Sequence, residues 1–85
     1  MELDAKFQDA AARVQKLKSR PSNDVLLDLY ALYKQGSAGD VEGKRPGLLD
    51  VKGRAKYDAW SKRKGLAKDQ AKTEYVALVD RLSAG

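Results

Sequence analysis

Apolar residues recur at every third or fourth position along four segments of this 85-residue chain, which is the spacing of a helix with one buried face. The first segment spans residues 3–17 and the last spans residues 71–82. Residues 25–33 form a wider apolar arc, typical of a helix that contacts two neighbours or lines a groove. No segment shows the two-residue alternation of a half-buried strand, so the pattern predicts an all-α fold.

Cap and stop residues predict where the first two helices end. Pro21 disfavours helical geometry in the residue before it, so the first helix should stop near residues 19–20. Ser22, with Asn23 and Asp24, offers an N-cap for the second helix. Gly36 occupies the position expected for its C-terminal cap.

The third and fourth helices carry weaker signals. Asp50 predicts the N-cap of a helix over residues 51–64, with Gly65 as its stop. Ala67 is the expected N-cap of the last helix and has no side-chain acceptor, which costs about 0.5–2 kcal/mol. The third helix is expected to turn these residues inward, with the tryptophan in the core: Val51, Ala55, Tyr57, Ala59 and Trp60.

Residues 36–50 contain four glycines and Pro46 without any periodicity, and therefore predict a long loop. Loops of this length are usually functional or disordered. A loop that spans the length of a helix allows the third helix to run parallel to the second. We expect a single domain over residues 1–85, a four-helix bundle of up-down-down-up connectivity.

Composition narrows the classes of function. The chain has no cysteine and no histidine, which removes thiolate metal sites and the commonest general base, so we expect no enzymatic activity, no metal and no cofactor. The net charge of +5 favours an anionic partner, or reflects only a well-solvated surface. No apolar run reaches the roughly 18 residues of a membrane span, and the N-terminal residues do not resemble a signal peptide. We expect a cytoplasmic monomer.

Two clusters could hold a phosphorylated ligand. Lys52 and Lys56 stand at i, i+4 on the third helix, an unfavourable spacing for like charges unless an anion lies beside them. Tyr30, Tyr33 and Lys34 offer aromatic rings, hydroxyls and an ammonium group, which suit a base and a phosphate. Taken alone, each lysine is more often a solvated surface charge, and each tyrosine is more often a core or rim residue than a ligand contact.

Four consecutive stretches carry a family resemblance: YALYKQG at 30–36, GD at 39–40, KRPGLLD at 44–50 and VKGRAKYDAW at 51–60. In this order and at this spacing they resemble the acyl-CoA binding protein family, and the likeness extends over nearly the whole chain. The resemblance implies a non-catalytic carrier and buffer of medium- to long-chain fatty acyl-CoA esters. It implies acyl-CoA as the ligand, with transient contact with membranes or acyl-CoA-using enzymes.

The resemblance also implies roles for individual residues. Tyr30, Lys34 and Lys56 match positions around the ribose 3′-phosphate, and Tyr33 lies near the adenine. The remaining ligand positions are Lys52, Tyr75, the small Ala11 and Gln15, and the acyl groove is bordered by Leu26, Leu27 and Ala55.

The chain departs from the family pattern at several positions. Leu66 and Ala67 replace the usual hydroxyl-bearing start of the last helix, which bears on stability instead of binding. Gln15 stands where many members have a lysine, Val51 where a phenylalanine is usual, and Tyr57 where a tryptophan is usual. They bear on one head-group contact and on the shape of the groove. The alternative function is a small basic nucleic-acid-binding module, although the basic residues are spread over all four helices.

Overall fold

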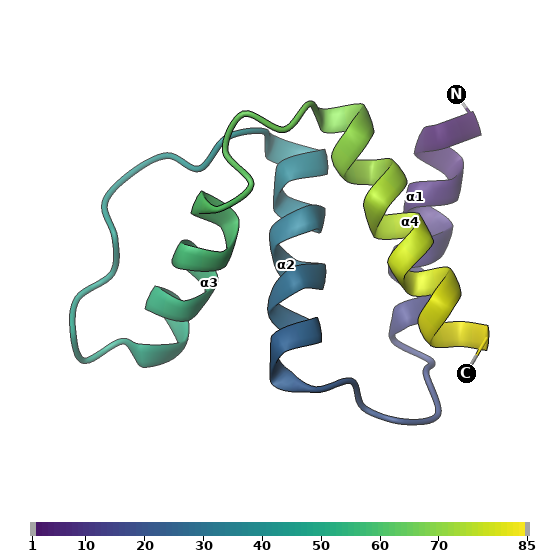
Figure 1. Cartoon of the computed structure of the whole chain (residues 1–85), viewed down its shortest axis with the longest axis horizontal. Coiled ribbons are helices and arrows are strands. Elements are labelled where there is room, and N and C mark those ends of the chain that lie inside the picture. Colours follow the sequence, from purple (N-terminus) through teal and green to yellow (C-terminus); the bar gives the residue numbers. More distant parts are fainter. Residues whose placement is uncertain (1, 85) are drawn as a thin grey trace.

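The computed structural model describes residues 2–84, which form four helices and no strand: α1 (Glu2–Val14), α2 (Asn23–Ala38), α3 (Val51–Ser61) and α4 (Lys68–Ala84). In Figure 1, α1 and α4 run downward while α2 and α3 run upward, so α2 and α3 are parallel. This confirms the predicted all-α, up-down-down-up arrangement. The molecule is thin, with extents of 36 × 29 × 15 Å.

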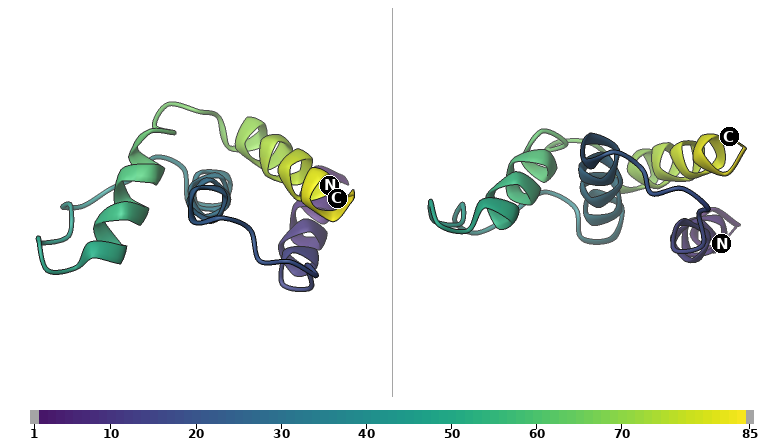
Figure 2. Two further views of the ribbon diagram at one scale, coloured as in Figure 1. Left: turned by 60° about the horizontal axis from the view of Figure 1, so that its bottom comes forward. Right: turned by 90° about the horizontal axis from the view of Figure 1, so that it is seen from below.

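The hydrophobic core lies between α1, α2 and α4. Figure 2 shows α1 and α4 on one side of α2 and α3 on the other. The buried core residues are Phe7, Ala10, Leu29, Leu32, Ala71, Tyr75 and Val79. Because these side chains come from three helices, α3 is attached to the outside of a core that it does not build.

The prediction that α3 turns a set of residues inward is wrong for Val51 and for Trp60 as a core residue, whereas Ala55, Tyr57 and Ala59 are partly buried. The helix has no buried residue, Val51 is 73% exposed and Trp60 is only partly buried. The reason is that α2 is the only helix that α3 packs against within residues 2–84, so no second helix covers its remaining faces. A helix with one neighbour leaves most of its surface to solvent.

The N-terminal helix is shorter than its apolar stripe. It ends at Val14 instead of residues 19–20, and the amide groups of Gln15 and Lys16 bond to carbonyls three residues back, at 3.3 and 2.9 Å. Such tightened bonds are common in a last helical turn. Leu17 continues the stripe and is still half-buried, because burial depends on position rather than on helical geometry.

The second helix begins as predicted and ends later than predicted. The Ser22 hydroxyl caps it by accepting from the Val25 amide at 3.3 Å. Gly36 is not the cap, because the helix continues to Ala38 and ends at Gly39, whose φ is +89°. A Cβ on Gly36 would lie 3.0 Å from the Lys72 side chain, so this glycine instead lets α2 approach α4 closely.

A buried glutamine joins the end of α2 to both neighbouring links. The Gln35 side chain donates to Asp40 and to the Leu66 carbonyl, each at 2.8 Å, and accepts from the Trp60 indole at 3.1 Å. Asp40 in turn accepts from the Gly65 amide, and this bond, together with the one from Gln35, holds the pKa of the Asp40 carboxyl below its usual range. The network fixes the ends of α2 and α3 relative to α4.

The loop over residues 39–50 is fastened along α3. Arg45 makes a bidentate pair with Asp58, at 2.8 and 2.6 Å, and the Tyr57 hydroxyl donates to the Gly43 carbonyl at 3.0 Å. Asp50 caps α3 as predicted, accepting from the Gly53 amide at 3.0 Å. Tyr57, one of the departures from the family pattern, therefore has a structural use as a loop anchor.

The link to α4 is tighter than expected. The third helix ends at Ser61, not at residue 64, and the amides of Arg63 and Lys64 bond to carbonyls three residues back before Gly65 turns the chain with a φ of +91°. Ala67 precedes α4, and its carbonyl accepts from the Ala71 amide at 2.9 Å. It supplies no side-chain cap, in line with the weak start predicted from the sequence.

Candidate functional site

A cavity of about 510 Å³ lies where α1, α2 and α4 meet. Five of the residues expected to contact a ligand line it: Ala11, Gln15, Tyr30, Tyr33 and Tyr75. The others in its wall are Val14, Leu26 and Leu29. The side chains converge because Tyr30 and Tyr33 share the face of α2 that also holds Leu26 and Leu29.

Aromatic rings form one side of this cavity. Phe7 stacks on Tyr33 with 5.3 Å between ring centroids and meets Tyr75 edge-on at 5.2 Å. Tyr33 and Tyr75 lie 5.8 Å apart. Phe7 and Tyr75 are buried whereas Tyr33 is 37% exposed, so the cluster holds one aromatic ring at the surface. An exposed ring in a fixed orientation is suited to stacking with a planar base.

Tyr75 contributes a neutral hydroxyl. Burial, together with the nearby Tyr33, raises the pKa of the Tyr75 hydroxyl above its ordinary value. The group therefore remains protonated over the physiological range and can both donate and accept a hydrogen bond.

Two lysines bring positive charge to the space between α2 and α3. The Lys56 ammonium on α3 lies 5.3 Å from the centre of the Tyr30 ring, and the Lys34 ammonium on α2 lies 5.1 Å from the centre of the Trp60 ring. Cation–π contacts of this kind contribute about 0.5–1 kcal/mol at exposed sites. Neither lysine has an ion-pair partner among residues 2–84, so both charges are available to an anion.

Lys52 lies outside the cavity that five of the candidate residues line. It is exposed on the first turn of α3, one turn before Lys56 and on a similar face of the helix. It does not line the cavity of Tyr30 and Tyr33.

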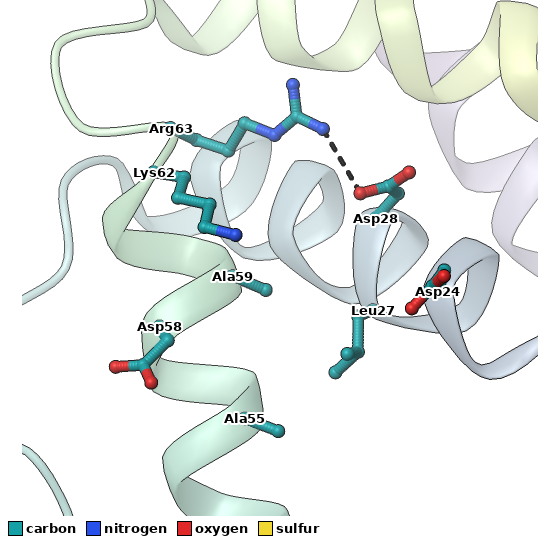
Figure 3. Close-up of a pocket in the computed structure, with 8 residues that line it drawn as sticks. All are labelled: Asp24, Leu27, Asp28, Ala55, Asp58, Ala59, Lys62 and Arg63. Carbon is teal, nitrogen blue, oxygen red and sulfur yellow. Dashed lines mark hydrogen bonds and ion pairs between the residues drawn. The ribbon is translucent and has the colours of Figure 1, made fainter.

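A second cavity, of about 580 Å³, lies between α2 and α3, where Leu27, Ala55 and Ala59 point into it (Figure 3). Leu27 and Ala55 were expected to border an acyl groove at this place. Leu26, expected beside them, lines the other cavity, because adjacent residues lie about 100° apart around a helix.

Charged residues form the rim of this second cavity, and the sequence pattern did not predict them. Arg63 lies 3.4 Å from Asp28 across the gap between the helices (Figure 3). The complete rim consists of Asp24, Asp28, Asp58, Lys62 and Arg63. The i, i+4 spacing of Asp24 and Asp28 with Leu27 could have placed the two acids on this face of α2, but the pairing with Arg63 depends on the fold.

The arrangement is suited to binding a polyanion with an aromatic base and an apolar chain. One cavity presents an aromatic surface with hydroxyl groups, and the Lys56 ammonium lies over the Tyr30 ring in its wall. The Lys34 ammonium lies over Trp60, and an apolar strip lies between α2 and α3. Five other cations are already paired with carboxylates, namely Lys6, Arg13, Arg45, Arg63 and Lys72, which does not favour a continuous basic surface for nucleic acid. Within residues 2–84, no group of three potential ligand side chains could hold a metal ion, and no helix is long and apolar enough to cross a membrane.

The family model described as acyl-CoA binding protein matches residues 4–79. The chain is 59% identical over 78 residues to acyl-CoA-binding protein homolog 1 of Caenorhabditis elegans, covering 92% of this chain and 91% of that protein. It is 46% identical over 78 residues to the acyl-CoA-binding protein of Saccharomyces cerevisiae, covering 92% and 90%. The crystal structure of acyl-CoA-binding protein 2 from Oryza sativa is similar with a TM-score of 0.92 and 38% identity, covering 96% of this chain and 89% of that one.

Proposed function

Because this chain belongs to the acyl-CoA binding protein family, we propose that it binds medium- to long-chain fatty acyl-CoA esters without converting them. The observation that carries the proposal is the meeting of the Lys56 ammonium and the Tyr30 ring at the mouth of an aromatic cavity. This combination offers charge, hydroxyl groups and a stacking surface within one site. An acyl-CoA head group has the matching phosphate charges and adenine base.

The nucleotide end of the ligand occupies the cavity between α1, α2 and α4. The adenine stacks against Tyr33, the ring that the aromatic cluster holds at the surface. The ribose 3′-phosphate receives the Tyr30 hydroxyl and the ammonium groups of Lys34 and Lys56, whose charge-assisted bonds are the strongest available here. The other contacts in this proposal come from Ala11, Gln15, Lys52 and Tyr75.

The acyl chain follows the apolar strip between α2 and α3. Leu27 and Ala55 point into this space (Figure 3), and their small or branched side chains leave room for a hydrocarbon tail. Each buried methylene contributes about 0.8 kcal/mol, so affinity rises with chain length.

The biological role that follows is a carrier and buffer of acyl-CoA esters. We place it in the cytoplasm as a monomer, with residues 1–85 forming one binding domain. The match of the family model to residues 4–79 supports the single domain.

Mass spectrometry of the undenatured protein tests the proposal. After incubation with palmitoyl-CoA, the protein should gain the mass of one ligand molecule, and protein purified from cells should already carry acyl-CoA species. An unliganded mass under both conditions contradicts the proposed function.

A further inference from the structure

The turn before α3 exposes three large apolar side chains. The Asp50 amide donates to the Gly47 carbonyl at 3.0 Å, which places Leu48 and Leu49 at the two central positions of the turn. Leu48 is 80% exposed, Leu49 is fully exposed and Val51 is 73% exposed. Central turn positions favour proline, glycine, asparagine and aspartate, so two adjacent leucines there have no local structural reason. We call Leu48, Leu49 and Val51 the apolar tip.

The apolar tip is held in place from both sides. On the helix side, Asp50 caps α3 through the Gly53 amide, and a Cβ on Gly53 would collide with the Asp50 carboxylate, so only glycine permits this close cap. On the loop side, the Arg45–Asp58 pair and the Tyr57–Gly43 bond fasten the preceding residues to α3. The leucines therefore project into solvent from a fixed turn instead of folding back onto the core.

The tip lies far from the core of the bundle. In Figure 1 the loop and the first turn of α3 form the corner of the molecule opposite α1 and α4. An exposed apolar group at the edge of a molecule can contact a protein surface or a membrane without any rearrangement of the fold.

Positive charge surrounds the tip. Lys44, Lys52 and Arg54 flank it along the chain and make no ion pair within residues 2–84. Two acidic residues lie in the same stretch: Glu42, and Asp50, whose carboxylate is engaged in the helix cap. The local balance is therefore cationic around an apolar centre.

We propose that the apolar tip docks the protein onto anionic phospholipid membranes, with Leu48, Leu49 and Val51 inserted at the interface and Lys44, Lys52 and Arg54 near the lipid headgroups. Apolar side chains that enter the headgroup–acyl boundary, combined with cations, are the requirements for binding at a membrane surface. The cations that flank the apolar side chains complement the negative charge of anionic lipid headgroups, so the charge favours a membrane surface. The docking does not rest on the proposed acyl-CoA binding.

The apolar tip lies next to the helix that carries part of the proposed ligand site. The tip continues directly into α3, which holds Ala55 and Lys56 one to two turns later. Docking therefore brings the space between α2 and α3 close to the lipid surface. A hydrophobic ligand could then pass between membrane and protein over a short path.

Vesicle sedimentation with the full-length, ligand-free protein tests this proposal. At low ionic strength the protein should sediment with mixed phosphatidylcholine–phosphatidylserine vesicles and much less with pure phosphatidylcholine. The double variant Leu48→Ser/Leu49→Ser should lower the partition coefficient at least about tenfold, because each fully buried leucine is worth about a factor of ten or more. Circular dichroism and palmitoyl-CoA binding of this variant should match the wild type, because neither leucine contacts the core or the cavities.

Two charge-reversal variants distinguish a local effect of the cations beside the apolar tip from an effect of the net charge of the protein. Lys44→Glu lies beside the tip, whereas Lys68→Glu makes the same change at the start of α4. Lys44→Glu should weaken vesicle binding by about fivefold or more, and Lys68→Glu should have a clearly smaller effect. Failure of the wild type to bind anionic vesicles overturns the proposal, as does equal binding by the double leucine variant or an equal loss in the two charge variants. If the apolar tip instead binds a protein partner, the wild type should fail to bind anionic vesicles.

Discussion

The ammonium nitrogen of Lys56 lies 5.3 Å from the centre of the Tyr30 ring, and this contact joins two helices whose sequences are separated by the long loop. It depends on the parallel course of α2 and α3, because an antiparallel return would carry Lys56 to the other end of α2. The fastened loop thus has a role in assembling the site. Arg45 and Tyr57 hold the chain that makes the parallel return.

Replacement of Lys56 by alanine should weaken palmitoyl-CoA binding by about 1.5–3 kcal/mol, the range for a hydrogen bond to a charged group. Calorimetric titration measures the change. Lys68→Ala, on the N-terminal turn of α4, is the control and should bind like the wild type. An unchanged dissociation constant for Lys56→Ala would remove this residue from the head-group site.

A substitution at Gln15 should strengthen ligand binding instead of weakening it. It lines the head-group cavity at a position where many members of the family have lysine. Gln15→Lys should tighten palmitoyl-CoA binding by about 1 kcal/mol, or roughly fivefold, since the added charge is exposed and screened. The gain should shrink as salt is added. Equal or weaker binding at low salt would show that the ligand phosphates do not reach this side of the cavity.

Gln35 should be important for stability, because its buried amide satisfies groups from three parts of the chain. Gln35→Met keeps the length of the side chain and leaves the Leu66 carbonyl without its partner. We expect a loss of about 1–3 kcal/mol in the free energy of unfolding, measured with urea. The exposed control Gln8→Met should stay within about 0.5 kcal/mol of the wild type, and a similarly small loss for Gln35→Met would contradict the role of the network.

Acid should destabilise the fold in a manner that depends partly on Asp40. The pKa of this carboxyl is lowered in the folded protein by the Gly65 amide and the Gln35 amide, so its stabilising effect is present above the unfolded value of 3.8 and is lost as pH falls through the folded pKa. The pKa values of Asp4 and Asp58 are lowered by Lys72 and Arg45 and act in the same direction. The unfolding temperature should therefore decrease when the pH is lowered below about 4.

The isosteric variant Asp40→Asn isolates the share of this one carboxyl. It should be less stable than the wild type at neutral pH and should lose less stability on acidification, so the two curves converge at low pH. Parallel curves across the acid range would mean that Asp40 does not contribute to the acid response.

Local signals were enough to place some features of the fold. Ser22 and Asp50 were predicted as caps because a helix start is set by the few residues around it. The prediction of Gly36 as a cap is wrong. A glycine is needed there because of the nearby Lys72 side chain, which is distant in the sequence and therefore not visible in a local pattern. Val51 was misjudged as inward for a similar reason, since burial on α3 depends on how many helices surround it.

Some features of the candidate site also follow from the sequence, whereas others depend on the fold. The shared face of Tyr30 and Tyr33 follows from helical spacing, and the family resemblance supplied their roles together with those of Lys34 and Lys56. The separation of Leu26 from Leu27 into different cavities could not be predicted, because it depends on where α1 and α3 lie around α2. The Asp28–Arg63 pair was missed because its partners are far apart in the sequence.

Calorimetric titration with palmitoyl-CoA, acetyl-CoA and free coenzyme A tests the central claim most directly. If the head group binds between α1, α2 and α4 and the tail lies between α2 and α3, palmitoyl-CoA should bind one to one and far more tightly than the other two ligands, since each buried methylene adds about 0.8 kcal/mol. Equal affinity for all three ligands, or no binding of any of them, would contradict the account.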